Sequence, residues 1–488
     1  MGTEQVMGPD RPLAEGRWNG QHDLVLIAIV LLALGPRLVL SIVNTGANDP
    51  HMEVVSLILE TNRLPHFDDC FQCYQPKLFH QITAAAVAAV GLEDPGRQRR
   101  LAQLLNFVAA LGTVIVLWQM ALQLPGGPGV RLLSFALVAL NPRFNAITAQ
   151  ATNDSFVIFF GAVTIYSLWR FLEGASRWYC TSAVVSLILM SLAKTQGMVF
   201  FAMIVTILLA KILAARAEPI ARRRLAGALL ATILCFAATV PFLGPYYAHY
   251  QRNGDPFAAN WERMPAPDWV EQSLHRRPGV RSIVDGYFTF RIVDMLRQPY
   301  VMERPCKLRT LAGKKIYDPR CSEHRTSFWS QLYGRAQFIQ FAPYPDSWRT
   351  RDPLILELGR ALILLGLVPL AILLYGLALE VRGLVVGMAR HGPVWLARDN
   401  RWVLLAVLGG AILTVAQLEF LMRDFRSMKV IYTFPALVCF MAVFMRGFSD
   451  LTRRVAHRPR MLAGLYGIHA LVLSLYVADI CWLIGQQW

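Results

Sequence analysis

Acidic side chains, histidines and prolines are concentrated between residues 48 and 80, directly after the first long apolar run. The stretch reads Asn48-Asp49-Pro50-His51-Met52-Glu53, then His66-Phe67-Asp68-Asp69, then Tyr74-Gln75-Pro76-Lys77-Leu78-Phe79-His80. Carboxylates and imidazoles are the side chains that most often exchange protons with a substrate. Such a density of them beside an apolar helix is unusual for a simple connection. The stretch therefore predicts a functional site, with Asp49 as its leading acid.

Three further groups of polar residues lie at the ends of later apolar runs. They are Asn153-Asp154, Lys194-Thr195-Gln196-Gly197, and the basic set Arg423, Arg426 and Lys429. Two of these groups also have a simpler interpretation. Asp154 is as well explained as the cap of a helix that begins at Ser155. The basic set is at least as well explained by contact with lipid headgroups.

The first loop has simpler interpretations as well. His51 and His80 are more often hydrogen-bonded structural groups than ligands of a substrate. Asp68 and Asp69 could serve only to solvate the loop, and we favour that interpretation slightly. Glu53, Asp69, Gln75, His80 and His51 are nevertheless kept as candidates for binding donor or acceptor, together with Asp154, Lys194, Arg423, Arg426 and Lys429.

The elements that must position these residues are apolar helices. Of the 488 residues 55% are hydrophobic and the mean hydropathy is +0.40, and the apolar residues occur in runs long enough to cross a bilayer. We expect an all-α polytopic membrane protein with about eleven transmembrane helices. The runs are roughly 23–43, 102–123, 130–151, 155–173, 178–195, 197–214, 225–247, 354–379, 402–422, 428–445 and 461–484.

The net charge of +16 does not indicate a nucleic-acid-binding protein. The basic residues lie at the ends of apolar runs and form no stripe on a soluble domain, so most of them are interpreted as determinants of topology. No small-residue cleavage site follows the first run, and we expect it to stay as the first helix. Only seven of the 48 basic residues are Lys, and this richness in Arg, with abundant Ala and Leu, favours a bacterial source.

A further apolar stretch at 81–92 is only about a dozen residues long, and its placement decides the sidedness of all later loops. If it does not span, the basic connections 211–224, 382–401 and 446–460 share a side with the N-terminus. The positive-inside rule makes that side cytoplasmic. We therefore expect 81–92 to lie at the outer interface or to dip into it, with Arg97, Arg99 and Arg100 as exceptions to the rule.

This topology divides the chain into four parts. We expect a cytoplasmic tail at 1–22 and a transmembrane module at 23–247, whose first outer loop 44–101 contains juxtamembrane helices. A small extracytoplasmic subdomain follows at 248–353, and the remaining transmembrane helices occupy 354–488.

The eight cysteines divide evenly between apolar runs and polar connections. Cys70, Cys73, Cys306 and Cys321 lie in the two long outer connections, where two disulfides could form in an oxidising compartment. Cys70 and Cys73 have the spacing of zinc ligands, but no second pair matches them, so a local disulfide is favoured over a zinc site.

In their order along the first 200 residues, the polar motifs resemble a known family. Asp49 follows the first helix, Gln75 to His80 open a juxtamembrane helix, and Asn153-Asp154 stand at the outer end of the third helix; Lys194 to Gly197 are a softer fourth. This series resembles the GT-C superfamily of polyprenyl-phosphate-sugar-dependent glycosyltransferases, especially the protein O-mannosyltransferases and the lipid A aminoarabinose transferase. Two departures are clear: the family commonly has Asp-Glu where Asp49 is followed by Pro50, and the region 248–353 matches none of its motifs.

The resemblance implies a GT-C-like fold and an inverting transfer of a sugar from a lipid phosphate. Such a reaction needs a carboxylate to take the proton of the acceptor hydroxyl, and cations to hold the departing phosphate. Asp49 fits the first role, while Lys194, Arg423, Arg426 and Lys429 fit the second.

The leading hypothesis is thus a multi-pass glycosyltransferase of a bacterial inner membrane, with its active site on the periplasmic side. Its expected partners are a polyprenyl-phosphate sugar donor, a protein, lipid or glycan acceptor, and membrane lipids, but no nucleic acid. No cofactor is expected with certainty, and a divalent metal is left open. The alternative is a transporter or lipid flippase. Against it, the charged residues lie at one membrane face and no inverted repeat is visible.

Overall fold

The fold was obtained as a computed structural model of the full 488-residue chain. The structure describes residues 18–47, 49–66, 68–216, 218–239, 247, 250–251, 284, 286–301, 309–311, 314–316, 327–343, 345–350, 352–422 and 429–487.

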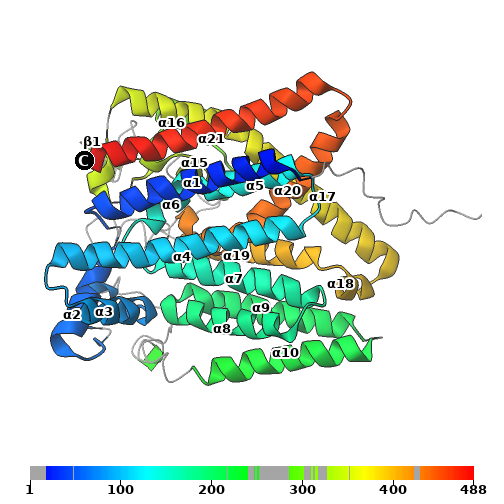
Figure 1. Ribbon diagram of the computed structural model, residues 1–488, viewed down its shortest axis with the longest axis horizontal. Helices are drawn as coiled ribbons and strands as arrows, with labels where there is room; N and C mark the ends of the chain where they lie inside the picture. The colour runs from blue at the N-terminus through cyan, green and yellow to red at the C-terminus, as the bar shows by residue number, and fades with distance from the viewer. Residues whose placement is uncertain are drawn as a thin grey trace, which may run out of the picture.

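Long apolar helices dominate the described residues and run side by side along the longest axis of the molecule (Figure 1). In the described part of the chain, seven segments are long and apolar enough to cross a membrane. They confirm that the protein is a multi-pass, predominantly helical membrane protein. The seven are α1 (Gly20–Val43), α4 (Pro95–Gln123), α7 (Asp154–Leu172), α9 (Gln196–Ala214), the pair α16–α17 (Pro353–Leu365 and Leu367–His391), η7–α20 (Val430–Ala436 and Leu437–Val455) and α21 (Pro459–Gln487).

Further helices complete the bundle. Apolar ones include α5 (Pro128–Ala139), α8 (Arg177–Ala193) and α19 (Arg401–Met422). In addition, α10 (Pro219–Ala237) has three consecutive arginines at 222–224 near its start, and α18 (Val394–Arg398) is a single turn. The described residues of all eleven predicted runs are therefore largely helical.

Three predicted runs are interrupted in the structure. The run 130–151 is two helices, because α5 ends at Ala139 and α6 (Pro142–Thr148) starts anew at Pro142. Proline has no N–H to continue a helix and is favoured at a first turn; the Asn141 side chain caps that turn by accepting from the Phe144 amide at 3.0 Å. The run 354–379 breaks at Gly366, and the run 428–445 begins with a 3₁₀ segment that contains Pro435.

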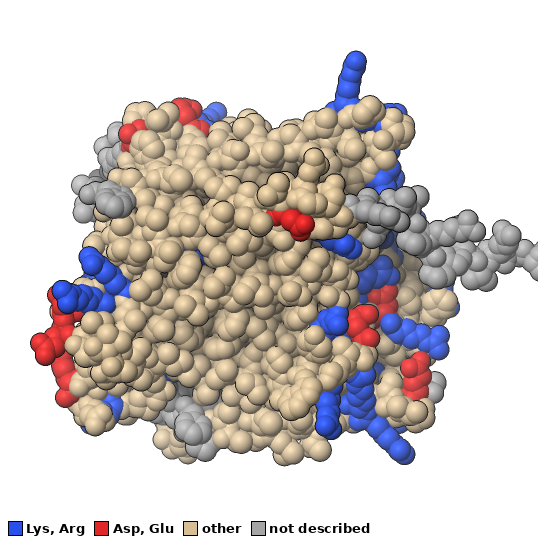
Figure 2. All heavy atoms as spheres, viewed as in Figure 1, with Lys and Arg blue, Asp and Glu red and all other residues tan. Residues whose placement is uncertain are grey.

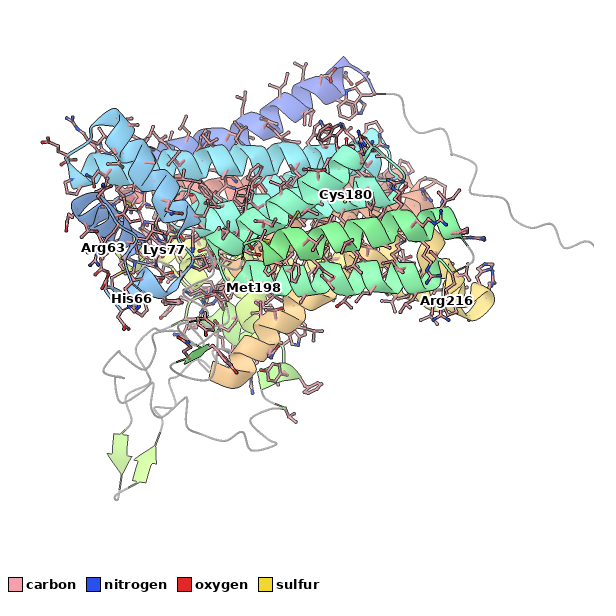
Figure 3. The ribbon with its side chains drawn as sticks, turned by 90° about the horizontal axis from the view of Figure 1, so that it is seen from below. Arg63, His66, Lys77, Cys180, Met198 and Arg216 are labelled. Atoms are coloured by element: carbon pink, nitrogen blue, oxygen red, sulfur yellow. A yellow bond between two sulfur atoms is a disulfide. The ribbon has the colours of Figure 1, made fainter. Side chains whose placement is uncertain are left out.

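Charged side chains gather at the two ends of the bundle. On the face in Figure 2, uncharged residues form a broad middle zone, with most Lys, Arg, Asp and Glu on either side of it. Arg216, from the connection between α9 and α10, lies at the opposite end from Arg63, His66 and Lys77 of the first loop (Figure 3). The predicted topology likewise places the first loop and the connection 211–224 on opposite sides of the membrane.

The first loop folds into two short helices and a 3₁₀ turn beside the start of α4 (Figure 1). These are α2 (His51–Thr61), η1 (Phe71–Tyr74) and α3 (Leu78–Val90). With 13 residues, α3 is shorter than the roughly 20 residues that a bilayer requires, as predicted for the stretch 81–92. A disulfide joins Cys70 to Cys73 across η1, as the spacing of the two residues favours.

The predicted subdomain 248–353 is described only in part. Its described elements are α14 (Ile292–Arg297), an antiparallel ribbon of β1 (Arg309–Leu311) and β2 (Lys314–Ile316), α15 (Phe328–Gln337), η5 (Ile339–Phe341) and η6 (Asp346–Trp348). Of these, α15 contacts α6 and η7, and η5 contacts α6 and α16. This part of the segment thus packs on the helical bundle. Cys306 and Cys321 lie outside the described residues.

Candidate functional site

The start of the loop that carries Asp49 is fixed by buried hydrogen bonds. Asn44, which ends α1, is 2% exposed. Its side-chain oxygen accepts from Trp348 Nε1 at 3.1 Å and from the Gly46 amide at 2.9 Å, and its carbonyl accepts from Gln103 Nε2 at 3.0 Å. Asp49 follows within five residues, is half-buried, and its carbonyl accepts from the His51 amide at 2.8 Å.

Two buried histidines tie α2 to α3. Nδ1 of His51 and Nε2 of His80 lie 3.0 Å apart, and neither residue has exposed surface. One imidazole nitrogen must donate and the other accept, which requires at least one neutral ring. Burial lowers the pKa of His51 to about 4, with the carboxylate of Asp49 opposing that shift and Lys194 adding to it. The pair is therefore neutral near pH 7 and fixes the first residue of α2 relative to α3.

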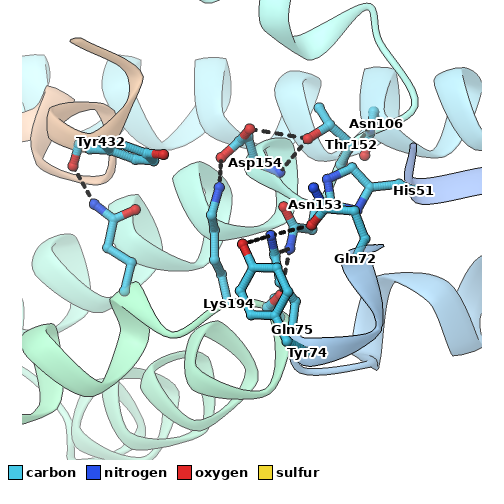
Figure 4. Close-up of polar contacts among 12 residues, drawn as sticks. His51, Gln72, Tyr74, Gln75, Asn106, Thr152, Asn153, Asp154, Lys194 and Tyr432 are labelled. Carbon is cyan, nitrogen blue, oxygen red and sulfur yellow. Dashed lines mark hydrogen bonds and ion pairs between the residues drawn. The ribbon is translucent and has the colours of Figure 1, made fainter. Parts of the chain in front are cut away.

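A buried ion pair stands at the beginning of α7. Lys194 Nζ lies 2.5 Å from Asp154 Oδ1, and their side chains are only 13% and 4% exposed. Thr152 Oγ1 donates to the other carboxylate oxygen at 3.0 Å. As the first residue of α7, Asp154 also places its negative charge at the positive end of the helix dipole. Its carboxylate is thus held by three favourable interactions (Figure 4).

The capping interpretation of Asp154 does not match this geometry. The N-cap residue of α7 is Asn153, and it makes no side-chain capping bond. Asp154 lies one residue later and uses its carboxylate on Lys194 and Thr152, from which we infer that its side chain serves the polar cluster.

Lys194 is positioned by a tight turn between α8 and α9. A Cβ atom at Gly197 would overlap the backbone of Ser191 and Met190, so only glycine permits this approach. Gln196 Nε2 donates to the carbonyl of Tyr432, and Lys194 Nζ lies 5.3 Å from the centre of the Tyr432 ring. A cation at this distance from an aromatic ring is attracted to it. The turn between α8 and α9 is therefore held against η7 by side-chain contacts.

A chain of side-chain amides connects the first loop to α7. Gln75 Nε2 donates to Gln72 Oε1 at 2.6 Å, and Asn153 Nδ2 donates to Gln75 Oε1 at 2.5 Å. Asn153 also donates to the Ala193 carbonyl at 3.0 Å, next to Lys194. Tyr74 accepts from Gln75 at 3.1 Å. Figure 4 shows these residues beside the Asp154–Lys194 pair.

Electrostatic interactions bring the separate motifs into one cluster. The pKa of His51 responds to Asp49, Lys194, Asp154 and Lys429. Burial and the neighbouring Tyr432 raise the pKa of Tyr74 to about 12, and Asp49 also contributes to that rise. Although burial opposes it, the pKa of Lys194 is raised by Asp154, Tyr432 and Asp49. The candidate acid Asp49 thus lies within electrostatic range of the buried ion pair.

Some of the residues predicted as candidates have not been placed in this cluster. Glu53 is exposed in the first turn of α2. The Asp69 carboxylate accepts from the His66 amide at 2.8 Å. It also attracts the ammonium group of Lys77, and burial lowers the pKa of Lys77 to about 7. Asp68 forms a 3.7 Å ion pair with His66. Arg423 and Arg426 lie outside the described residues.

Other residues of the cluster were not predicted. Tyr432 has no distinctive spacing, and only the fold brings its ring to Lys194. In the described part of the chain, no three His, Cys, Asp or Glu side chains are grouped as a metal site would require.

Comparison with known proteins gives one family match. The family model described as dolichyl-phosphate-mannose-protein mannosyltransferase matches residues 80–244. The predicted resemblance is confirmed. The matched segment begins at His80 and includes Asn153, Asp154 and Lys194, but not Asp49. No curated protein matches the chain.

Several solved structures are similar to the chain at low identity. The Saccharomyces cerevisiae protein O-mannosyltransferase Pmt1-Pmt2 complex bound to the sugar donor has 16% identity and a TM-score of 0.37, covering 49% of this chain and 35% of that one. The Archaeoglobus fulgidus oligosaccharyltransferase has 10% identity and a TM-score of 0.48, and the match covers 96% of this chain and 56% of that one. ArnT from Cupriavidus metallidurans bound to undecaprenyl phosphate has 14% identity and a TM-score of 0.35, and the match covers 90% of this chain and 80% of that one.

At these TM-scores none of the three establishes a common fold by itself. The chain also spans about half the length, or less, of the first two structures. The family match over residues 80–244 is therefore the comparison that bears on the function.

Proposed function

We propose that the protein is a glycosyltransferase that moves a sugar from a polyprenyl-phosphate donor to a hydroxyl-bearing acceptor at the extracytoplasmic face of the membrane. The observation that carries the proposal is the gathering of Asp49 with the buried Lys194–Asp154 pair, the two histidines and Lys429 at one end of an apolar bundle. The family match of residues 80–244 supports the same reaction class.

In the proposed reaction, the acceptor oxygen attacks the anomeric carbon while the bond between that carbon and the phosphate oxygen breaks. The electron pair leaves with the phosphate, and the configuration at the anomeric carbon is inverted. Asp49 takes the proton of the attacking hydroxyl as general base. Its half-buried position suits this role, because it is open to a soluble acceptor and close to the ion pair.

The other residues of the cluster bind and position. Lys194 and Lys429 place positive charge where the leaving phosphate develops negative charge, and Asp154 holds the Lys194 ammonium in place. The His51–His80 contact and the amide chain from Gln75 to Asn153 fix the first loop against α3 and α7.

The sidedness rests on the basic connections. Arg216 lies at the end of the bundle opposite to His66 and Lys77 (Figure 3), and positive loops are retained in the cytoplasm. The cluster would then face the periplasm of a bacterial inner membrane.

The test is made in cells. A deletion strain is complemented with the wild-type gene, with Asp49→Asn, or with Glu53→Gln as a matched control, since Glu53 is an exposed acid four residues away. Mass spectrometry of lipid-linked sugars and envelope glycans should show loss of one glycan and accumulation of its lipid-linked donor in the deletion and Asp49→Asn strains only. Unchanged glycans and lipid-linked sugars in the deletion strain would contradict the proposal.

A further inference from the structure

A disulfide bond lies in the small apolar core of the first loop. Cys70 and Cys73 are joined, and they form a buried cluster with Val54 of α2, against which Leu57 and Ile58 pack. Cys73 is fully buried, whereas Cys70 is 9% exposed. Since two of the three buried residues in this cluster are the bonded cysteines, the disulfide supplies much of the packing between η1 and α2.

The turn that the disulfide closes also begins the amide chain of the candidate site. The bond encloses only Phe71 and Gln72. Gln72, 2% exposed, accepts from Gln75 Nε2 at 2.6 Å, and Gln75 Oε1 accepts from Asn153 Nδ2 at 2.5 Å (Figure 4). Asn153 directly precedes Asp154 of the buried ion pair. Two side-chain hydrogen bonds therefore connect η1 to the start of α7.

A buried lysine lies beside the second cysteine. Lys77 is 9% exposed, and its ammonium group donates to the carbonyls of Cys73 and, at 3.0 Å, of Gln75. Burial lowers the pKa of Lys77 to about 7, although the charge of Asp69 opposes that shift. A neighbouring cation stabilises a thiolate. The surroundings of the bond thus favour Cys73 as the sulfur that leaves when the disulfide is reduced.

We propose that Cys70–Cys73 is a reversible thiol–disulfide site, whose oxidised form holds η1 in the amide chain and whose reduced form releases it. The reductant is a dithiol. Its thiolate attacks Sγ of Cys70, the cysteine with exposed surface, and the S–S bond breaks. The electron pair leaves on Cys73 Sγ, which takes a proton. The second thiol of the reductant then displaces Cys70, so that the protein holds two thiols and the reductant becomes a disulfide.

Reduction should act locally, because the closed loop is very short. The two cysteines are three positions apart, and the entropy that a cross-link removes from the unfolded chain decreases with the length of the loop that it closes. The helical bundle should therefore stay folded while η1 and the residues bonded to it become more mobile. An effect on sugar transfer rests on the proposed function, whereas the redox site itself does not.

The test is hydrogen exchange, read by mass spectrometry, on purified full-length protein in detergent before and after treatment with dithiothreitol. Alkylation of the new thiols measures the fraction of Cys70–Cys73 that is reduced. Reduction should speed exchange about three- to ten-fold in peptides covering 70–77 and 150–156, as expected for the loss of one or two hydrogen bonds. Exchange in α20 and α21 should stay unchanged.

The double variant Cys70→Ser/Cys73→Ser should show the exchange of the reduced wild type and should not respond further to dithiothreitol. Cys481→Ser, which replaces a free cysteine, is the control and should behave like the wild type. If the double variant fails to fold, the comparison of oxidised and reduced wild type still decides. Sugar transfer by the wild type should fall in proportion to the reduced fraction and return on reoxidation.

The proposal is overturned if Cys70 and Cys73 resist dithiothreitol in the folded protein, or if their reduction leaves exchange at 150–156 unchanged. An equal response of the double variant to dithiothreitol would also overturn it, because the effect would then come from another part of the chain. So would equal sugar transfer by the oxidised and reduced forms. Absence of transfer from both forms, with the exchange result as expected, would refute the proposed function and leave the redox site standing.

Discussion

Replacing Lys194 by methionine should destabilise the protein by several kcal/mol. The Asp154 side chain is 4% exposed and its carboxylate lies 2.5 Å from the Lys194 ammonium. The substitution therefore removes the ion-pair partner of a buried charge and leaves it the Thr152 hydroxyl and the start of α7. Removing one partner of a buried ion pair typically costs about 3–5 kcal/mol. The double variant Lys194→Met/Asp154→Asn should recover much of this loss, because no unpaired charge then remains.

The measurement is a double-mutant cycle on purified protein in detergent, with chemical or thermal unfolding as the readout. Arg454→Met is the matched control: Arg454 pairs with Asp450 at 2.7 Å, but its side chain is 65% exposed. An exposed pair contributes about 0–1 kcal/mol. If Lys194→Met costs no more than Arg454→Met, or if the effects of the two single variants simply add in the double variant, the buried pair does not hold the site together.

Three further expectations follow. Because the folded pKa of His51 is about 4, below the unfolded value near 6.5, the folded protein binds fewer protons between these pH values. Because the unfolded state takes up this proton first, the protein should lose about 3 kcal/mol of stability as the pH falls from ~6.5 to 4. His51→Gln should remove this loss, and an acid-unfolding curve as steep in His51→Gln as in the wild type would contradict the reasoning. Reporter fusions after residues 218, 390 and 455 should all report cytoplasm, and a periplasmic result at two of them would overturn the topology. Cys306 and Cys321 should form a disulfide worth about 3 kcal/mol in the chain-entropy model, and labelling of both as free thiols in non-reduced protein would exclude it.

Much of the fold could be predicted because bilayer-length apolar runs leave few alternatives to helices. The interruptions could not be placed from hydropathy, since Pro142 and Pro435 are themselves compatible with an apolar run. Asn141, which caps α6, shows in retrospect that the sequence carried a local signal for the first break.

The candidate site could be predicted only in outline. Asp49, His51 and Asp154 stood out by residue type and position, and the structure brings them into one cluster. The pairing of Asp154 with Lys194 depends on how α7 packs against the turn after α8, which local pattern does not encode. Asp69 was a reasonable candidate by type, but its hydrogen bond with the His66 amide keeps it within its own loop.

The most direct test of the central claim is sugar transfer by purified Asp49→Asn from a polyprenyl-phosphate sugar, once the donor is identified. The substitution keeps the size of the side chain and removes its basicity. Loss of a positioned general base should lower the rate about 10²–10⁴-fold, with donor binding and folding unchanged and Glu53→Gln near wild type. Turnover of Asp49→Asn close to that of the wild type would contradict the assignment of Asp49 as the base.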